Sequence, residues 1–496
     1  ANSKAGQRIG YDPWLTTRAF LRAAEAAVAA DLVAVDSNPV DAVWVDQPAP
    51  SPLPAEVLAD QFAGRSSAAK RADIAAGLRA KGVRHAVIEA LDSVAWLFNI
   101  RGRDVPRTPV VRAFAILSDD GRATLFTDPA KITPEVAAHL GPEVTVKPYG
   151  DFGPALAALS GTVTLDPAWS VAAVWQALET AGVPLVEARD PCIAPKAAKN
   201  PVELEGMRQA HVRDGLAVTR FLHSMAVHPA KDESDAQDRL EGYRRESNLL
   251  KDLSFDSISA FGPNAALPHY HCEPETNRAI TQGIYLIDSG GQYPDGTTDI
   301  TRTIAIGRPT PEMKDRFTRV LKGHIALANA RFPEGTRGGA LDILARQFLW
   351  SAGLDYAHGT GHGVGHYLAV HEGPQRIGAG GASGVDEPLK AGMVLSNEPG
   401  FYKVGEYGIR IENLVIVQED RRAGDERDML AFETITLAPI DRNLIEPALL
   451  TAEETAWLDA YHARVRDAYH DQLSGEALDW FLAATAPIGR VEMAAA

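Results

Sequence analysis

Two proline-rich stretches, at residues 48–54 and 191–201, set the strongest limit on how this chain can fold. Proline fixes φ and lacks a backbone N–H, so the first stretch cannot form a regular helix or a central strand and is typical of a linker. The chain has 496 residues, more than a single hydrophobic core usually organises. We therefore predict a multidomain protein with about three domains.

The part between the two proline-rich stretches alternates between helical and strand patterns. Residues 66–80 predict an amphipathic helix, and short apolar runs predict strands at 85–88, 95–100, 114–117, 124–126 and 162–165. This alternation is typical of an α/β domain.

Capping signals mark two helices in the second half of the chain. Asn200, Pro201 and Glu203 have the order of a capping box with proline at the first helical position. Thr310 and Pro311 open another helix. The glycine-rich residues 378–384 lack the spacing of a phosphate-binding loop, so we predict only a mobile loop there.

Composition excludes several classes of partner. Lys and Arg number 49 against 65 Asp and Glu, a net charge of −16, which argues against nucleic acid or an anionic membrane as the main partner. No run of about 18 apolar residues occurs.

Cys192 and Cys272 lie far apart and outside any metal-binding spacing, so we expect both to be inert thiols in a reducing, cytoplasmic compartment.

Residues 284–306 predict a β-hairpin, because apolar or alternating runs flank the turn sequence Pro294-Asp295-Gly296. Asp288 ends the first run and Asp299 begins the second, so the two carboxylates can face each other across the pair. Carboxylates held this close cannot both stay ionised unless a cation lies between them. For the hairpin alone, surface aspartates in water are the commoner explanation.

Residues 358–366 combine histidines with alternating glycines. His358 and His362 are four residues apart, but glycine at every second position makes a helix very unfavourable, at about 1 kcal/mol each. In an extended chain the histidines share one face, and the glycines on the other let a second backbone approach closely. His371 follows a few residues later.

Two glutamates complete a set of potential ligands. Glu398 stands at a predicted strand end, before Pro399 and Gly400. Arg410 and Glu412 share one face of another predicted strand. A carboxylate buried on such a face needs a partner, although a local Arg–Glu pair would satisfy each glutamate taken alone.

Together, these residues resemble the five metal ligands of the creatinase/methionine-aminopeptidase ("pita-bread") superfamily: Asp288, Asp299, His362, Glu398 and Glu412. Further stretches are similar to the long, three-domain Xaa-Pro aminopeptidase (aminopeptidase P) branch, at 10–15, 199–208, 264–270, 358–365, 396–400 and 408–413. The resemblance covers essentially the whole chain.

The resemblance implies a mixed α/β and α+β multidomain fold. Residues 1–62 would be a remnant or the C-terminal part of a first creatinase-type α/β domain with its linker. Residues 63–196 would be a second such domain, 197–436 a pita-bread catalytic domain, and 437–496 its C-terminal extension. Only a few residues precede the 10–15 stretch, so we expect half of the first domain to be lacking or its beginning to be absent.

The resemblance also implies two divalent metal ions that share a bridging water. Asp288 would chelate one ion, Asp299 and Glu412 would bridge both, and His362 and Glu398 would complete the other. Four carboxylates balance the charge of two divalent cations, and ligands of this kind suit Mn²⁺, with Co²⁺ or Zn²⁺ left open.

The implied activity is hydrolysis of the N-terminal Xaa-Pro bond of peptides with proline in the second position. Glu398 would be the general base and Arg410 would hold the Glu412 side of the site. His269, His358 and His371 would orient the substrate, while we expect His324 and His366 to be structural.

The amino-acid sequence leaves three alternatives open. A prolidase would have the same metals and act on dipeptides, a creatinase-type enzyme would lack part of the metal set, and a non-catalytic pita-bread scaffold would bind peptides without hydrolysis. A homodimer is a family expectation only.

Overall fold

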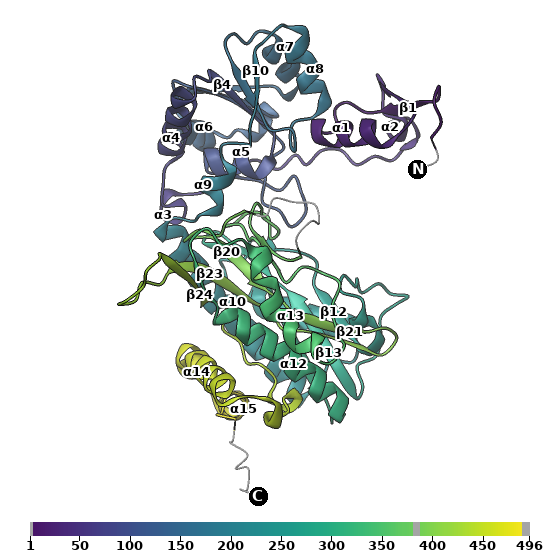
Figure 1. Ribbon diagram of the computed structural model, residues 1–496, viewed down its shortest axis with the longest axis vertical. Coiled ribbons are helices and arrows are strands. Elements are labelled where there is room, and N and C mark those ends of the chain that lie inside the picture. Colours follow the sequence, from purple (N-terminus) through teal and green to yellow (C-terminus); the bar gives the residue numbers. More distant parts are fainter. Residues whose placement is uncertain (1–2, 380–386, 489–496) are drawn as a thin grey trace, which may run out of the picture. The chain divides into compact units, whose positions relative to one another are not determined.

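The computed structural model describes residues 3–379 and 387–488. The chain forms two compact units, residues 1–196 and 197–496 (Figure 1). The finer division into four parts stays a prediction. Most of the glycine-rich loop predicted at 378–384 lies outside the described residues.

A six-stranded mixed sheet with strand order β10-β9-β4-β6-β7-β8 forms the centre of the first unit. β4 is parallel to β9 and antiparallel to β6. The strands of this sheet are β4 (His85–Ile88), β6 (Phe114–Ser118), β7 (Ala123–Phe126), β8 (Val144–Lys147), β9 (Val163–Leu165) and β10 (Leu185–Glu187). This is the predicted α/β arrangement.

Helices and short strands make up the rest of the first unit. The helices are α3 (Asp60–Ala63), α4 (Ser67–Ala80), α5 (Leu91–Phe98), α6 (Pro134–Leu140), α7 (Phe152–Ala157), α8 (Ala172–Thr180) and α9 (Ile193–Ala197). Before them come β1 (Arg8–Tyr11), α1 (Arg18–Ala27), β2 (Asp31–Ala34), α2 (Pro39–Val43) and β3 (Glu56–Val57), which pairs with β5 (Ile100–Arg101). Phe152 of α7 and Trp175 of α8 pack with Phe126 in one apolar core.

The strand predicted at residues 95–100 is wrong. These residues form the end of helix α5 and the start of the short β5, and Asn99 in a left-handed conformation (φ 49°) ends the helix. Every side chain from Ser93 to Phe98 is buried. A short apolar run buried on all sides has no periodicity that separates a helix from a strand. The other predicted strands and the helix capped by Ser66 are confirmed.

Antiparallel sheets and long helices build the second unit, which has the pita-bread fold that the resemblance implies. One sheet has the order β12-β13-β16 and another β17-β24-β23-β20. Their strands are β12 (Ile258–Phe261), β13 (Gly283–Ser289), β16 (Ile300–Ile306), β17 (Arg331–Pro333), β20 (Val394–Asn397), β23 (Asn413–Glu419) and β24 (Met429–Thr434). The shorter strands are β11 (Asp252–Leu253), β14 (Gly291–Tyr293), β15 (Gly296–Thr297), β18 (Gly361–His362), β19 (Arg376–Ile377), β21 (Gly400–Lys403) and β22 (Tyr407–Arg410).

The helices of this unit bury apolar faces against the sheets. They are α10 (Pro201–Val227), α11 (Glu233–Arg245), α12 (Pro311–Ala328), α13 (Asp342–Trp350), α14 (Ala452–Tyr469) and α15 (Gly475–Ala484). The capping box predicted for α10 is present, and Thr310 caps α12 as expected. Leu458 and Val465 of α14 pack with Phe317 and Leu321 of α12, so the C-terminal helices share a core with the rest of the unit. In the described parts of the chain, no helix is both long and apolar enough to cross a bilayer.

Candidate metal centre and active site

Three of the predicted ligands lie close together in the described residues. Ligand atoms of Asp299, His362 and Glu412 all lie within 4.8 Å of one another. His362 Nε2 lies 3.3 Å from Asp299 Oδ2 and 3.6 Å from Glu398 Oε1. Asp299 and Glu412 are only 4% and 1% exposed, so these two carboxylates are withdrawn from water, whereas His362 is half-buried.

The ligands lie at the ends of strands from different parts of the chain. Asp299 precedes β16, His362 ends β18, and Glu398 follows β20. Glu412 lies between β22 and β23, so the prediction that it shares one strand with Arg410 is wrong. Glu412 nevertheless lies beside Asp299 and His362. Thr301 Oγ1 donates a hydrogen bond to Glu412 Oε2 at 2.7 Å.

The predicted hairpin is confirmed, but its register differs from the expected one. β13 pairs with β16 so that Asp288 faces Thr301, and Asp299 lies just outside the paired strands. The residues between them form a smaller hairpin, β14–β15, which turns at Pro294-Asp295. Asp288 and Asp299 are therefore not directly opposite each other. The charge of Asp288 still acts on Asp299 and helps to raise its pKa.

The histidine–glycine stretch is only partly extended. β18 covers Gly361 and His362 alone, so the prediction of one strand with all its histidines on one face is wrong. The role expected of the glycines holds. A Cβ on Gly361 would overlap the carbonyl oxygen of Ser396, and one on Gly363 would overlap that of Glu372. Glycine lets these two segments pass against the backbone of the stretch.

Arg410 connects Asp288 to the rest of the site. Its Nη2 donates to Asp288 Oδ2 at 2.6 Å, Nε donates to Thr301 Oγ1 at 3.0 Å, and Nη1 donates to the Tyr402 hydroxyl at 2.7 Å. Thr301 links Arg410 to Glu412, because it accepts from Arg410 and donates to Glu412. The expected task of Arg410, holding the Glu412 side, stays a prediction.

Sequence reasoning missed Thr301 and Tyr402. Thr301 lies on the same alternating face as Asp299, and this period of two was visible in the sequence. Tyr402 and Arg410 are diagonal neighbours across the β21–β22 pair, in which Gly400 faces Arg410 and Tyr402 faces Gly408. That register requires the tertiary structure.

Burial and like charges shift the pKa values of the cluster. Burial and the charge of Asp288 raise the pKa of Asp299 to about 7. Burial, Asp299 and Asp288 raise the pKa of Glu412 well above its usual range. Burial lowers the pKa of His362, but the hydrogen bond to Asp299 and the charge of Glu398 outweigh it and raise the value to about 9. The four carboxyl groups of the cluster thus outnumber its two cationic side chains, His362 and Arg410.

The residues present fit divalent cations. Asp288 Oδ1 is buried and has no hydrogen-bond partner among the described residues. Carboxylate oxygens with one imidazole nitrogen are a donor set suited to hard or borderline divalent ions. An orphaned carboxylate oxygen beside three further acids is a ligand arrangement that such ions complete.

Of the expected substrate histidines, His269 and His371 are exposed and His358 is half-buried. The exposed His371 ring lies 4.2 Å from the His362 ring, nearly perpendicular to it. The charge of His362, then burial and His269, lower the pKa of His371 to about 4. The half-buried His358 bonds the Tyr402 hydroxyl through Nε2 at 2.8 Å, and burial lowers its pKa. His269 lies in an exposed segment after β12.

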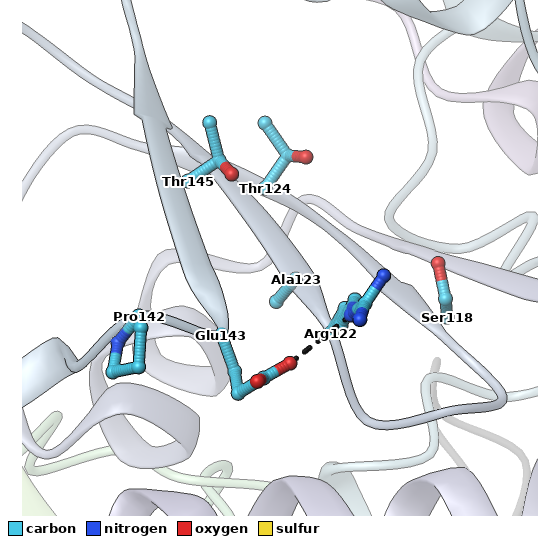
Figure 2. A pocket seen from close by; sticks show the side chains of 7 residues that line it. All are labelled: Ser118, Arg122, Ala123, Thr124, Pro142, Glu143 and Thr145. Carbon is cyan, nitrogen blue, oxygen red and sulfur yellow. Dashed lines mark hydrogen bonds and ion pairs between the residues drawn. The ribbon is translucent and has the colours of Figure 1, made fainter.

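A hollow on the first unit is separate from this chemistry. It lies over β7, β8 and the preceding turns, and Figure 2 shows Arg122 and Glu143 pointing toward each other beside it. They form an exposed ion pair, Nε to Oε2 at 3.1 Å. The hollow is lined by Ser118, Arg122, Ala123, Thr124, Pro142, Glu143 and Thr145. None of these is a predicted site residue.

Acids at strand ends with one imidazole among them, beside one half-buried and two exposed histidines, are groups suited to a metal-dependent hydrolase. Comparisons with known proteins then give the family. Residues 205–419 match the model of metallopeptidase family M24, residues 46–203 that of the creatinase/prolidase N-terminal domain, and residues 428–488 that of the C-terminal region of peptidase M24. The chain belongs to metallopeptidase family M24.

Individual relatives agree with this assignment. The chain is 45% identical to a probable Xaa-Pro aminopeptidase P of Aspergillus fumigatus, over 98% of this chain and 78% of the relative. It is similar to the crystal structure of X-prolyl aminopeptidase from Caenorhabditis elegans, described as a cytosolic enzyme with a di-nuclear active site (TM-score 0.92, 35% identity, 98% of this chain and 82% of that one). A dipeptidase from Mycobacterium ulcerans matches less well (TM-score 0.59, 27% identity, 75% of this chain and 96% of that one). The family resemblance and fold class predicted from the sequence are confirmed.

Proposed function

We propose that this protein is a metal-dependent aminopeptidase that hydrolyses the N-terminal Xaa-Pro bond of peptides with proline in the second position. The observation that carries the proposal is the cluster of Asp299, His362 and Glu412 beside Glu398, in which both carboxylates of the first group are buried. It occurs in a chain that is 45% identical over 98% of its length to a probable Xaa-Pro aminopeptidase P.

Five residues hold two divalent ions in this proposal: Asp288, Asp299, His362, Glu398 and Glu412. When bound, such an ion pair lowers the pKa of water and stabilises the negative charge that develops on the scissile carbonyl. The di-nuclear active site described for the worm enzyme supports two ions. Mn²⁺ is the ion we propose, because the ligand set is rich in carboxylate and contains no thiolate.

The chain's own groups place the substrate and move protons. Glu398 accepts the proton of the attacking water, and Ser396 Oγ orients its carboxylate by donating to Oε1 at 3.2 Å. His269, His358 and His371 orient the scissile carbonyl, contact the proline and return a proton to the leaving nitrogen. Tyr402 holds His358 for this task. Arg410 keeps Asp288 in place with a charge-assisted hydrogen bond.

Prolidase activity is the second candidate. The similarity to a dipeptidase over 75% of this chain favours it, whereas the match of residues 428–488 to the C-terminal region of the family and the longer overlap with aminopeptidases favour the first. The presence of all five expected ligand residues argues against a non-catalytic scaffold.

Initial rates with Arg-Pro-Pro and Ala-Pro, on metal-stripped protein and after addition of Mn²⁺, test the proposal. We expect release of arginine from the tripeptide only with metal, and slow turnover of the dipeptide. Faster turnover of Ala-Pro would make the protein a prolidase. No turnover of either peptide with two ions bound would make it a scaffold.

Location and assembly are further parts of the proposal. A cytoplasmic location is supported by the cytosolic worm relative and by two free cysteines. A homodimer rests on the family resemblance, and light scattering of the purified protein tests it.

A further inference from the structure

His324 of helix α12 lies against the adjoining ends of β20 and β23, next to which Glu398 and Glu412 lie. It is fully buried, at 0% exposure. Its Nδ1 donates to the carbonyl oxygen of Asn397 at 3.1 Å, and its Nε2 accepts from Asn413 Nδ2 at 3.0 Å. A third hydrogen bond involves the backbone of His324: Asn397 Nδ2 donates to its carbonyl oxygen at 2.9 Å. These bonds fit a neutral imidazole with its proton on Nδ1.

The two asparagines flank two of the proposed ligands. Asn397 and Asn413 face each other at the end of the antiparallel β20–β23 pair. Asn397 is followed directly by Glu398, and Asn413 follows Glu412 directly. A side chain that bonds both asparagines therefore sets the separation of the strand ends from which the two glutamates extend.

Arg302 holds Asn413 from the other side. Its Nη2 donates to Asn413 Oδ1 at 2.9 Å, while its Nη1 donates to the backbone carbonyl of Glu412 at 2.7 Å. Arg302 is 2% exposed and Asn413 is 0% exposed, so these bonds form away from water. Both ends of the Asn413 amide are thus occupied by fixed partners, which leaves the amide one orientation.

We infer that His324 is a positioning residue that fixes Glu398 and Glu412 relative to each other for metal binding. The inference rests on the proposed metal site and assigns a role to a histidine expected to be merely structural. Metal ions respond to small displacements of their ligands, and partners that orient ligands typically change metal affinity about 10–100-fold when removed. His324 acts through the two asparagines and touches neither ion nor substrate.

Metal binding to His324→Leu tests the inference. Leucine leaves the Asn397 carbonyl and the Asn413 amide without their partner. Metal-stripped protein is titrated with MnCl2 in a calorimeter, and kcat and KM are measured with Arg-Pro-Pro at saturating Mn²⁺. We expect Mn²⁺ affinity to fall about tenfold, the lower end of that range, and kcat to fall more than KM changes.

His462→Leu is the matched control. His462 is also 0% exposed, and its Nε2 accepts a hydrogen bond from the Ile440 amide at 3.1 Å, but no bond joins it to either asparagine. It should lose stability as His324→Leu does and bind Mn²⁺ as the unaltered protein does. Equal Mn²⁺ affinities of the two variants would overturn the inference.

Two further outcomes are decisive. If His324→Leu does not fold, His324→Phe replaces it, because a phenyl ring keeps the planar shape of the imidazole and can form a hydrogen bond with neither asparagine, and the same comparison applies. If the unaltered protein binds no Mn²⁺, the proposed metal site is wrong and the inference falls with it. If it binds Mn²⁺ and His324→Leu binds it equally well, only the inference is wrong.

Discussion

Arg410 donates hydrogen bonds to three different side chains of the site, those of Asp288, Thr301 and Tyr402. It is 2% exposed, and its pKa stays well above the usual range because Tyr402 and Asp288 outweigh the effect of burial. A planar guanidinium can serve these directions at once, whereas an ammonium group cannot.

Arg410→Lys should therefore keep the charge and lose the arrangement. We expect kcat/KM for Arg-Pro-Pro to fall about 10–100-fold, the loss typical when partners of metal ligands are removed. Initial-rate measurements at saturating Mn²⁺ check this. Arg208→Lys is the control, because Arg208 forms a bidentate salt bridge with Glu433 outside the site, with both hydrogen bonds at 2.8 Å. An equal loss in both variants would contradict the prediction.

Glu89 gives the first unit a pH-dependent stability. Burial raises its pKa to about 7 from an ordinary 4.5, although its Oε2 accepts a hydrogen bond from the Val171 amide. The folded state therefore binds a proton that the unfolded state releases between these values. The stability contributed by the protonated group is present below pH 4.5 and is lost as the pH rises through about 7.

Glu89→Gln should remove this pH dependence. We expect the variant to resist opening of the first unit better than the unaltered protein at pH 8, and to show no such advantage at pH 4.5. Hydrogen exchange of peptides spanning residues 83–98, compared at both pH values, measures the difference. An advantage of the same size at both would contradict the assigned cause.

At the scale of elements, the site depends on segments that cross very closely. β18 pairs with β19, and its residue Gly361 lies against the carbonyl of Ser396 in β20. This crossing brings His362 of β18 beside Glu398, which follows β20. A side chain at position 361 would separate the two strands and so separate two ligands.

Gly361→Ala should lose most activity. The added methyl group overlaps a backbone atom, which cannot swing aside, and overpacking of this kind costs about 1–3 kcal/mol or more. We expect weaker Mn²⁺ binding and at least about a tenfold fall in kcat/KM, measured by calorimetry and initial rates. Gly242→Ala in α11 is the control, because nothing lies within 4 Å of its added Cβ. It should keep full activity, and the prediction fails if the two variants behave alike.

At the scale of the whole molecule, the chain folds as two compact units and all five proposed ligands belong to residues 197–496. The apolar cores of the units are built from different residues. A ligand that binds only the folded state stabilises what it binds, by about 2.7 kcal/mol at a concentration 100 times Kd.

Saturating Mn²⁺ should therefore slow hydrogen exchange in the second unit far more than in the first. The strongest effect is expected in β16, β20 and β23, which adjoin the proposed ligands. Exchange measured by mass spectrometry with and without Mn²⁺ checks this. Equal protection of β4 and β9 in the first unit would show that the ions do not act where we place them.

The family and the mixed α/β layout were predicted from the sequence and are confirmed, and the sequence also named a set of candidate metal ligands that stays a prediction. Those signals are local: Asp288, the His358–His362 spacing and the Glu398 segment each stand in a short stretch whose residue types limit the chemistry. Helix caps at Asn200 and Thr310 are equally local, and both were predicted correctly.

The distances and contacts between those residues could be obtained only from the tertiary structure. The register that places Asp288 opposite Thr301, the helix at 91–98 and the gap between strands at Glu412 depend on packing against distant segments. The contacts of Tyr402, Arg302 and His324 were equally invisible, because the bond between His324 and Asn413 joins residues 89 positions apart in the chain. Short-range patterns specify which groups are available, and long-range packing sets the distances on which metal binding depends.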